Sequence, residues 1–506
     1  MYGLICGEKT SEVFGNVRDF TENCSSESLS DATESLLWGF IKTSIDIMFE
    51  ENYKAVVLGA GESGVGAALL YKSRGIEVFV SDYGKIAEKY KIELEEHAIP
   101  YEEGTHSTSV ILRASEVVKS PGIPEKAPIM QAIREQGIPV ISEIELAGRY
   151  LRGKVIGITG SNGKTTTTMW LHHILSEAGL RVGLAGNVGF SLARQVITDD
   201  QPEYFVVELS SFQLDDMYQF RVHIALLMNI TPDHLDRYHY NFEEYALAKM
   251  RILQNQTEED AFIYWGEDEF VSRYVMMHQP MPMHLLPFLT YPQVGSAADK
   301  SDDNMMRLHF EGKSFEFPID QLALQGPHNL QNAMAASIAA LHIGVSEEVL
   351  TRALEDFVNV PHRLEKVGVL DGVRYINDSK ATNISSTYYA LRTMTTPYVL
   401  ILGGEDKGND YLDITEQIVS GARGLIFLTT DVLKLYKAFH GKVKHIASAL
   451  SMEEAIAHAR QMAQPGDTVL LSPACASFDL FTSYIHRGDC FREIVQDLIR
   501  KQGKHD

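Results

Sequence analysis

A glycine-rich loop at residues 157–165 constrains this chain more than any other feature. It reads Gly-Ile-Thr-Gly-Ser-Asn-Gly-Lys-Thr, follows an apolar run and precedes a helical pattern at 169–178. Such a loop leaves backbone N–H groups free to face an anion, and the dipole of the following helix adds positive charge there. Lys164 can reach the outer phosphates of a nucleotide, and the Thr165 hydroxyl can bind Mg²⁺. The loop therefore predicts a nucleoside triphosphate site, although Ile158 stands where a strict P-loop has its first glycine.

Length and charge narrow the class of protein. The chain has 506 residues, which suggests about three domains rather than one core. Its 45 Lys and Arg against 68 Asp and Glu give a net charge of −23, which argues against nucleic acid or an anionic membrane as the main partner. Four widely spaced cysteines fit neither a zinc site nor a disulfide framework. With no apolar run of about 18 residues, these features indicate a cytoplasmic protein without a membrane span.

Strand and helix patterns alternate along most of the chain and predict an α/β fold with mostly parallel sheets. We predict a Rossmann-like domain at 48–148, a central P-loop-type domain at 149–358 and a second Rossmann-like domain at 359–506. Residues 1–47 form an extension of unknown function, and Met48 could be an alternative start. Among the shorter elements, we expect a strand near Val110, and only short strands and loops over residues 277–320.

A second glycine motif, at residues 59–64, follows a strand and opens a helix. It reads Gly-Ala-Gly-Glu-Ser-Gly, and Asp82 ends the next strand, so the dinucleotide fingerprint is complete. Taken alone, the motif favours a binding site for NAD or FAD. However, a glycine turn at a helix N-terminus binds any diphosphate, and a carboxylate on the next strand binds any sugar hydroxyl. A nucleotide-sugar diphosphate would fit equally well, and the rigid loop Ser120-Pro121-Gly122 could close over it.

Five further side chains are candidates for the nucleotide or metal site. Glu208 ends an apolar strand, where a carboxylate beside a phosphate loop can hold Mg²⁺, unless it is a plain loop residue. His234 follows another apolar strand and is either a metal ligand or a core histidine. Lys249 lies in a helical stretch, where the residue pattern alone favours a solvated lysine. Asn329 and Asn332 lie one helical turn apart and could bind an adenine edge, although Asn329 could instead cap its helix.

Three loops in the last third of the chain, at 377–383, 403–408 and 472–479, each follow a predicted strand. They carry side chains with positive charges and hydroxyl groups. Open α/β sheets bind ligands at the carboxyl ends of their strands, so these loops together suit an anionic small molecule. Arg363 lies in a hinge-like Val-Pro-His-Arg run. Cys475 is a poor nucleophile candidate, because no histidine partner is evident nearby.

In this order, the motifs resemble those of the Mur ligase family, from about residue 50 to the C-terminus. The loop at 157–165 is typical of the whole family. Three runs are similar to its D-glutamate-adding branch: Glu208-Leu-Ser-Ser-Phe-Gln-Leu, Asn377-Asp-Ser-Lys-Ala-Thr-Asn and Ser472-Pro-Ala-Cys-Ala-Ser-Phe-Asp. The Asp-Asn-Pro-Arg motif usual in the diaminopimelate-adding branch is absent from the sequence.

The resemblance implies a ligase that uses ATP to join D-glutamate to UDP-N-acetylmuramoyl-L-alanine in peptidoglycan synthesis, giving ADP and phosphate. The alanyl carboxylate becomes an acyl phosphate, the amine of D-glutamate attacks it, and a tetrahedral intermediate expels phosphate. Two Mg²⁺ ions, Lys164 and Arg363 would screen the repulsion between the carboxylate and the γ-phosphate. The resemblance also implies no NAD or FAD, no nucleic-acid or membrane partner, a monomer, and a third domain that swings about Pro361.

Carried over by position, the resemblance implies four groups of site residues. For ATP they are Gly160, Ser161, Asn162, Gly163, Lys164, Thr165, Thr166, Asn332, Arg363 and Asp378. For metal they are Thr165, Glu208, His234 and Lys249, the last as a carbamate. The UDP-linked substrate, on the first domain, would contact Gly61, Glu62, Ser63, Asp82, Ser120, Gly122 and Asn187. D-Glutamate, on the third domain, would contact Lys380, Thr382, Lys407, Ser477, Phe478 and Tyr484. The catalytic residues would be Lys164, His234, Lys249 and Arg363.

Two positions depart from the family pattern. Residues 264–268 lack an asparagine before the acidic pair, and Tyr83-Gly84 replaces a polar pair of the uracil pocket. Three alternatives stay open. The chain could be another amino-acid-adding Mur-type or folylpolyglutamate-type ligase. It could be an NAD-dependent oxidoreductase, on the strength of residues 59–64 alone. It could also be a nucleotide-switched binding protein without ligase chemistry.

Overall fold

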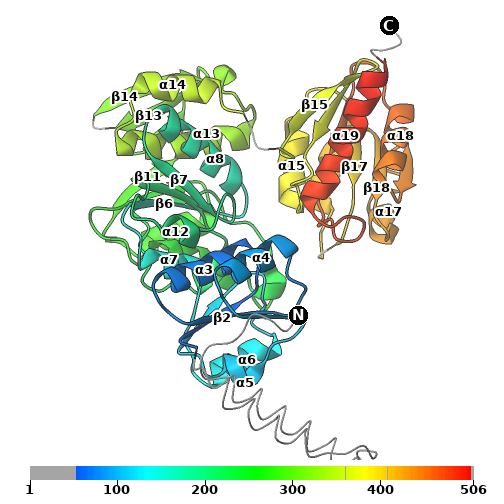
Figure 1. Cartoon of the computed structure of the whole chain (residues 1–506). Helices are drawn as coiled ribbons and strands as arrows, with labels where there is room; N and C mark the ends of the chain where they lie inside the picture. Colours follow the sequence, from blue (N-terminus) through cyan, green and yellow to red (C-terminus); the bar gives the residue numbers. More distant parts are fainter. Residues whose placement is uncertain (1–52, 311, 359–360, 407, 503–506) are drawn as a thin grey trace, which may run out of the picture. The chain divides into compact units, whose positions relative to one another are not determined.

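Three β-sheets, each covered by helices, make up the described part of the chain (Figure 1). The computed structural model describes residues 53–310, 312–358, 361–406 and 408–502. The predicted extension at 1–47 lies outside these ranges. Within them, none of the helices combines the length and the apolar character that a membrane span needs.

The first sheet has five parallel strands in the order β3-β2-β1-β4-β5, which is the order of the first five strands of a dinucleotide-binding fold. Its strands are β1 (Ala55–Leu58), β2 (Val78–Asp82), β3 (Tyr101–Glu103), β4 (Glu116–Lys119) and β5 (Val140–Ile141). Its helices are α3 (Glu62–Ser73), α4 (Glu88–Glu96), α5 (Thr108–Ile111), α6 (Pro128–Glu135) and α7 (Glu143–Gly148). The strand expected near Val110 is wrong, because Val110 lies in α5 and packs its side chain inward.

Two glycines make the tight turn between β1 and α3 possible. Gly59 has φ 90°, and a Cβ there would lie 2.5 Å from the Ser120 Oγ. A Cβ at Gly64 would lie 1.8 Å from the Gly59 carbonyl oxygen, so the helix packs directly onto the turn. The loop that begins at Ser120 therefore lies against the turn, which brings the two predicted substrate loops of this domain together.

The central sheet has nine strands in the order β14-β13-β12-β11-β10-β9-β6-β8-β7. Its strands are β6 (Lys154–Thr159), β7 (Val182–Gly186), β8 (Tyr204–Glu208), β9 (Ile224–Leu227), β10 (Ala261–Trp265), β11 (His284–Phe288), β12 (Ala298–Lys300), β13 (Met305–Phe310) and β14 (Lys313–Pro318). Its helices are α8 (Lys164–Glu177), α9 (Leu192–Gln195), α10 (Ser211–Asp215), α11 (Phe242–Met250), α12 (Glu269–Met277), α13 (Pro327–Ile343) and α14 (Glu347–Glu355), with short 3₁₀ turns η1 (Leu235–Arg237), η2 (Arg251–Leu253) and η3 (Ile319–Gln321). The strands from β7 to β12 run parallel, whereas β13 and β14 add an antiparallel edge.

The third sheet has six strands in the order β15-β16-β20-β17-β18-β19, parallel except for β15. Its strands are β15 (Glu365–Leu370), β16 (Val373–Asn377), β17 (Tyr398–Leu402), β18 (Ala422–Leu428), β19 (Ile446–Ala449) and β20 (Thr468–Leu471). Its helices are α15 (Ile384–Arg392), α16 (Leu412–Gly421), α17 (Leu433–Phe439), α18 (Met452–Met462) and α19 (Tyr484–Gln502). The predicted three-domain α/β fold with mostly parallel sheets is confirmed.

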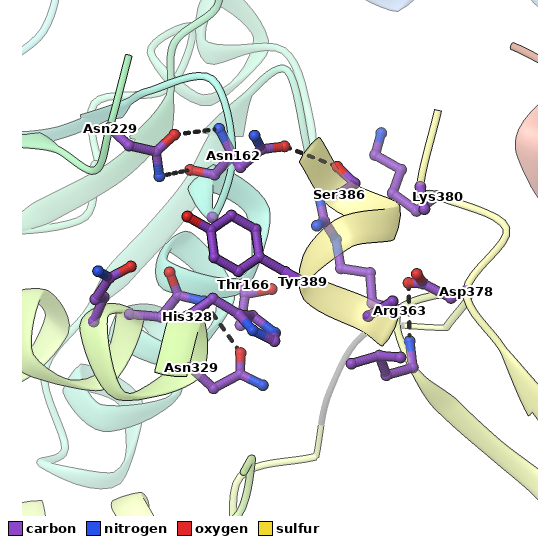
Figure 2. Close-up of a pocket in the computed structure, with 16 residues that line it drawn as sticks. Asn162, Thr166, Asn229, His328, Asn329, Arg363, Asp378, Lys380, Ser386 and Tyr389 are labelled. Atoms are coloured by element: carbon purple, nitrogen blue, oxygen red, sulfur yellow. Dashed lines mark hydrogen bonds between the residues drawn. The ribbon is translucent and has the colours of Figure 1, made fainter. Parts of the chain in front are cut away.

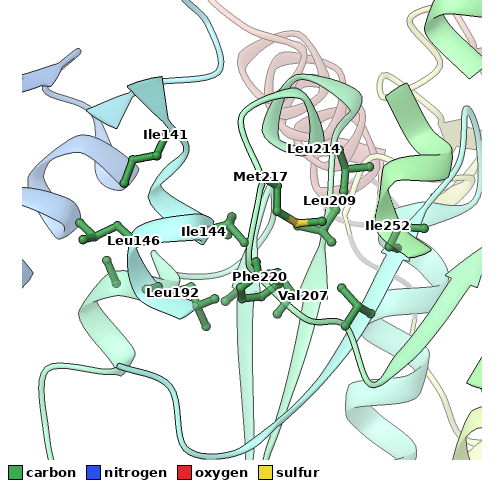
Figure 3. Close-up of a cluster of buried hydrophobic side chains, with 14 of the residues drawn as sticks. Ile141, Ile144, Leu146, Leu192, Val207, Leu209, Leu214, Met217, Phe220 and Ile252 are labelled. Atoms are coloured by element: carbon green, nitrogen blue, oxygen red, sulfur yellow. The ribbon is translucent and has the colours of Figure 1, made fainter. Parts of the chain in front are cut away.

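One continuous apolar cluster joins the first two sheets (Figure 3). Ile144 and Leu146 of α7 and Leu192 of α9 meet Val207 of β8 and Phe220, and all five side chains are buried. Contiguous apolar burial of this kind is the main favourable contribution to packing. The helix α7 that leaves the first sheet thus forms part of the core of the second.

A buried carboxylate accompanies this cluster. Glu143 is 4% exposed, and its Oε1 accepts hydrogen bonds from the Ser191 hydroxyl and the Ala193 amide, both at 2.6 Å. Burial raises the pKa of Glu143 to about 7, and nearby Glu62 adds to the shift. The native protein therefore holds a proton on Glu143 at pH values where the unfolded chain has lost it.

We expect a Glu143→Gln variant to remove part of the pH dependence of stability. Because the folded pKa is raised, the free energy of unfolding of the wild type falls as the pH rises from about 4.5 through about 7. Glutamine keeps the acceptor oxygen and cannot ionise, so the variant should gain roughly 1–3 kcal/mol over the wild type at pH 8. Urea midpoints at pH 5 to 8 measure this. The exposed Glu348→Gln serves as the control, and parallel pH profiles of wild type and Glu143→Gln would contradict the assignment.

Candidate active site

The predicted phosphate loop leaves β6 and ends at the first turn of α8. Gly160 has φ 149° and Gly163 has φ 86°, both in the region that favours glycine, and Gly163 is the N-cap of α8. Gly157, which the sequence placed at the start of the loop, lies inside β6. A Cβ there would be 2.8 Å from Val222, so this glycine serves strand packing instead.

Residues that follow β9 hold the loop in place, and sequence reasoning missed them. The Asn229 side chain accepts from the Asn162 amide at 2.9 Å and donates to the Asn162 carbonyl at 3.1 Å (Figure 2). Thr231 exchanges two hydrogen bonds with the Ser161 hydroxyl, at 2.8 and 2.9 Å. Asp268, the N-cap of α12, accepts from the Ile230 amide at 2.7 Å and so fixes this segment. The carboxylate at the position that departs from the family pattern thus positions the loop indirectly.

Lys164 bends back over its own loop. Its Nζ donates to the carbonyl oxygens of Gly160 at 2.8 Å and Ser161 at 3.0 Å, and burial lowers its pKa. Behind the loop, a Cβ at Gly163 would lie 2.5 Å from the Oδ1 of Asn332. Asn332 also accepts from Thr167 at 3.2 Å. The loop and α13 are therefore in direct contact, which keeps Asn332 beside the predicted nucleotide.

Asn329 does not cap its helix. The N-cap of α13 is Gly326, and the Asn329 amide donates to the Gln325 carbonyl at 2.9 Å and accepts from Asn332 at 3.2 Å. Asn329 instead links the asparagine predicted to contact adenine to the turn before the helix.

Glu208 has the properties expected of a cation ligand. It ends β8, is 1% exposed, and its Oε1 accepts from the Asn187 side chain at 2.9 Å. Its Oε2 is buried without a hydrogen-bond partner among the described residues. A buried carboxylate oxygen without a partner is costly unless a cation or donor binds it. Thr165, in the first turn of α8, is 7% exposed. A carboxylate and a hydroxyl oxygen are donors of the kind that Mg²⁺ binds.

Lys249, predicted with His234 as a ligand of the second metal, is not the solvated lysine that the residue pattern favours. Lys249 is 2% exposed, so the interpretation as a solvated lysine is wrong. Its Nζ donates to the Gly160 carbonyl at 2.9 Å and lies 4.7 Å from the Tyr245 ring centroid. Burial, reinforced by Lys164, lowers the pKa of Lys249 well below its ordinary value.

His234 is not a core histidine. Its side chain is 42% exposed, its φ is 52°, and its Nε2 lies 3.7 Å from an Asp233 carboxylate oxygen. Within the described ranges, no group of three or more His, Cys, Asp or Glu side chains comes close enough to hold a metal.

A pocket lies where the phosphate loop, α13 and the start of the third domain come together (Figure 2). Six residues predicted for ATP line it: Asn162, Gly163, Thr166, Asn332, Arg363 and Asp378. His328 and Tyr389 also line it, with their rings 5.7 Å apart, and neither was predicted. Burial, with a contribution from Arg363, lowers the pKa of His328 to about 4, and its Nδ1 is buried without a hydrogen-bond partner in the described structure. The only sequence signal for His328 was its place beside Asn329 after a Gly-Pro pair.

Arg363 is held between two residues in a left-handed conformation. His362 has φ 68° and Leu364 has φ 45°, which non-glycine residues adopt only under constraint. Asp378 accepts from the Leu364 amide at 3.2 Å and from the Ser472 hydroxyl at 2.9 Å, and burial raises its pKa to about 7. A Cβ at Gly488 would lie 2.2 Å from the His362 Nδ1, so α19 packs its backbone against the residue before Arg363.

Two of the predicted D-glutamate residues, Lys380 and Tyr484, are in contact on the third domain. Lys380 lies over the Tyr484 ring with its Nζ 4.0 Å from the centroid, and burial lowers its pKa to about 8. Ser477 is buried, Phe478 is 65% exposed, and Thr382 is half-buried. Lys407 lies outside the described residues. Buried Arg487 donates to the carbonyls of Ser379, Cys475 and Ala476 and so links the two loops.

Cys475 behaves as a structural thiol. It is 1% exposed, lies 3.2 Å from the Asn409 amide nitrogen and 3.3 Å from the Tyr411 hydroxyl, and burial raises its pKa to about 11. A protonated buried thiol is inert as a nucleophile.

The predicted UDP residues lie around the turn after β1. Asp82 accepts from the amides of Ala60 and Gly84, both at 2.7 Å. Gly61 and Ser63 begin α3, and Ser120 and Gly122 lie on the adjacent loop. The Glu62 carboxylate lies 3.0 Å from Arg194 and accepts from the Ser191 amide at 3.2 Å. Asn187 likewise binds Glu208.

Comparisons with known proteins identify the family of this chain. Three family models match in succession: the Mur ligase MurD-like N-terminal domain at residues 53–142, the Mur ligase middle domain at 158–340, and the Mur ligase glutamate ligase domain at 362–475. The chain is 58% identical over 450 residues to the UDP-N-acetylmuramoylalanine–D-glutamate ligase of Porphyromonas gingivalis strain W83, which covers 88% of this chain and 99% of that protein.

Solved structures of low sequence identity share the fold. UDP-N-acetylmuramate-alanine ligase MurC from Thermotoga maritima has a TM-score of 0.57 at 18% identity, covering 88% of this chain and 99% of that one. MurF ligase from the same organism, solved in complex with ADP, has a TM-score of 0.56 at 16% identity, covering 90% and 100%. From its domains, its motifs and its relatives, this chain belongs to the Mur ligase family.

Proposed function

We propose that this chain is the ATP-dependent ligase that joins D-glutamate to UDP-N-acetylmuramoyl-L-alanine, with release of ADP and phosphate, in cytoplasmic peptidoglycan precursor synthesis. The observation that carries the proposal is the 58% identity to a D-glutamate ligase over nearly the whole of that protein. We retain the predicted boundaries as part of it: 48–148 binds the UDP-linked substrate, 149–358 binds ATP and 359–506 binds the amino acid.

The triphosphate would lie on the loop 160–166, with its base toward Asn332. The pocket lined by Asn162, Thr166 and Arg363 supports this placement. His328 and Tyr389 offer two ring faces in the same pocket. Aromatic faces suit a nucleobase, because stacking works with any base.

Activation of the alanyl carboxylate brings this anion into contact with the anionic γ-phosphate of ATP. A carboxylate oxygen attacks the γ-phosphorus, ADP leaves, and the acyl phosphate forms. Lys164 and Arg363 supply fixed positive charge at this point, which is worth most in a site shielded from water. Mg²⁺ held by Thr165 and Glu208 would neutralise charge on the phosphate oxygens.

Capture of the acyl group would take place on the third domain. The amine of D-glutamate attacks the acyl carbon, loses a proton, and the tetrahedral intermediate releases phosphate. Lys380 and the buried Ser477 could bind the carboxylates of the amino acid. Lys407 would serve the same end, and Phe478 and Tyr484 would line the pocket.

The burial of Lys249 supports its proposed carbamylation. Only a neutral amine attacks CO₂, and the pKa of Lys249 is well below its ordinary value. The product is a carboxylate, which can share a second Mg²⁺ with His234, and the two-ion site is part of the proposal.

A coupled phosphate-release assay tests the proposed function. Phosphate should appear only when ATP, Mg²⁺, UDP-N-acetylmuramoyl-L-alanine and D-glutamate are all present, and omission of any one should stop it. A panel of amino acids, with L-glutamate and diaminopimelate included, separates this activity from other Mur-type and folylpolyglutamate-type ligases. Tight NADH binding without phosphate release would instead favour an oxidoreductase, and ATP binding without any turnover would favour a switch protein.

The uracil contacts involve a position where this chain departs from its family. Tyr83 is 74% exposed and its ring lies 5.8 Å from that of His106. His106 is fixed by the Ser81 hydroxyl at 2.7 Å, which also donates to Glu102 at 2.7 Å. Burial lowers the pKa of His106, so its ring is neutral at pH 7. We propose that the two rings form a stacking surface for the base beside Asp82.

We expect Tyr83→Ala to raise the KM for the UDP-linked substrate roughly tenfold, because a base–aromatic stack is worth ~1–3 kcal/mol. Tyr83→Phe should behave as the wild type, since the ring is kept. Steady-state kinetics with each substrate varied measures this, and the KM for ATP should not move. Tyr291→Ala, which removes a half-exposed tyrosine of the central domain, is the control; an unchanged KM in Tyr83→Ala would refute the stacking surface.

A further inference from the structure

Arg237 is the residue that connects the predicted substrate loop of the first domain to the predicted metal histidine of the central domain. Its Nη2 donates to the carbonyl oxygens of Pro121 at 3.2 Å and Gly122 at 3.1 Å. Its guanidinium also lies over the Phe212 ring, 4.5 Å from the centroid. One planar cation therefore touches both domains at once.

The loop that Arg237 contacts, residues 120–123, packs against the glycine turn at residues 59–64. The Ser120 amide donates to the Leu58 carbonyl at 3.0 Å, and the Ser120 side chain fills the space that a Cβ at Gly59 would need. A ligand that settles on the turn at 59–64 must therefore meet the loop whose carbonyls Arg237 binds. Pro121 makes this loop stiff, so a shift at one end is passed on.

On its other face, Arg237 is connected to His234 through Phe212. Phe212 meets the His234 ring edge-on, with centroids 5.2 Å apart, and stacks on Tyr238 at 6.0 Å. His234, Arg237 and Tyr238 belong to one short segment, because His234 is the N-cap of η1 (Leu235–Arg237). Tyr238 is anchored by its hydroxyl to Asp215 at 2.8 Å. The position of Phe212 therefore limits where the His234 ring can point.

A buried ion pair holds the same two elements together. Lys119, directly before the substrate loop, lies 2.8 Å from Asp216, and their side chains are 5% and 3% exposed. Asp216 is the C-cap of α10, the helix that carries Phe212. Lys119 and Asp216 thus join loop 120–123 to helix α10. Arg237 makes a second connection between the same two elements.

We infer that Arg237 is a positioning residue that links the seating of the UDP-linked substrate on loop 120–123 to the placement of His234. The inference rests on the function proposed above. It assigns Arg237 no contact with the reacting atoms. Arg237 acts on His234 indirectly, through its contacts with the Pro121 and Gly122 carbonyls and with the Phe212 ring.

Kinetics of Arg237→Met and Arg237→Lys give the first test. Methionine keeps the length of the stem but has no donor, and a lysine ammonium cannot span two carbonyls while it covers the ring. Both variants should lose about tenfold in kcat and gain about tenfold in KM for the UDP-linked substrate, each equal to ~1.4 kcal/mol. The KM values for ATP and D-glutamate should stay within about twofold. Phe212→Leu should lower kcat alone, and its combination with Arg237→Met should be no worse in kcat than Arg237→Met.

Arg74 provides a matched control. It also joins the two domains, with its Nη2 on the Val196 carbonyl at 3.0 Å and its guanidinium 4.8 Å from the Tyr150 ring centroid, but it touches neither loop. Arg74→Met should keep all four kinetic parameters. If Arg74→Met and Arg237→Met change them alike, Arg237 only holds the domains together and the inference is overturned.

Hydrogen exchange gives a readout that is independent of turnover. UDP-N-acetylmuramoyl-L-alanine alone, without ATP, should slow amide exchange at 120–123 and also at 231–238 in the wild type. Arg237→Met should keep the first effect and lose the second. Protection of 231–238 that is missing in the wild type, or that persists in the variant, overturns the inference. Failure of the proposed function would look different, since the wild type would then release no phosphate in the complete reaction.

Discussion

Lys249→Ala is expected to lower ligase activity roughly 10²–10³-fold, because charge stabilisation by a held metal is worth several kcal/mol. Lys249 is buried against the phosphate loop, and its amine is poised for CO₂ because its pKa is strongly lowered. Added acetate or propionate should restore part of the activity by occupying the position of the missing carbamate. Phosphate release in the full assay, with and without these acids, is the measurement.

Two controls make this result specific. Lys437→Ala, on the exposed face of α17, should keep full activity and should not respond to the acids. In the wild type, removal of CO₂ should lower activity, bicarbonate should restore it, and acidification should oppose the restoration because a protonated amine cannot form the carbamate. Turnover of Lys249→Ala at the wild-type rate would refute any metal role for this residue.

Glu208→Gln is expected to be comparably damaging, with a loss of roughly 10²–10³-fold in kcat. Its Oε2 is buried without a partner in the described structure, and an amide nitrogen there would present hydrogens to a cation instead of a lone pair. Higher Mg²⁺ should recover little of the loss. Equilibrium binding of Mn²⁺ in the presence of ADP should weaken in parallel, which separates a ligand role from a purely structural one.

Glu267→Gln is a suitable comparison for Glu208→Gln. Glu267 also follows a strand of the central sheet, β10, but its carboxylate accepts from the Thr290 amide and hydroxyl. Glutamine can keep one acceptor there, so this variant should retain activity and Mn²⁺ binding. Equal Mn²⁺ affinity in Glu208→Gln and the wild type would remove Glu208 from the metal site.

Several parallel strands, among them β1, β6 and β8, could be predicted because each is a short apolar run. β1, β6 and β8 are buried on both faces, and such strands carry a continuous apolar signal. The edge strands β13 and β14 lack that signal, because an antiparallel edge needs only one covered face. They lie in the region 277–320, where the sequence predicted short strands without their bounds. The strand expected near Val110 turned out to be α5, since four residues are too few for their period to distinguish a helix from a strand.

The site was less accessible to prediction wherever it depends on contacts between distant residues. Motif spacing identified Lys164, Glu208 and Asp378, each at the end of a strand or the start of a helix. It could not show that Lys249 is buried, because burial depends on the sheet onto which α11 packs. Asp268, His328 and Tyr389 carry no motif, and their contacts are with residues dozens of positions away. The bend of Glu62 toward Arg194 is likewise decided by a second domain.

The contact between Gly488 and His362 has a consequence for how the protein is made. Helix α19 is the last described element to leave the ribosome, yet it supplies the surface against which the residue before Arg363 is packed. A nascent chain already contains the whole phosphate loop while this arginine is still unsupported. We therefore expect nucleotide turnover to begin only after synthesis of α19.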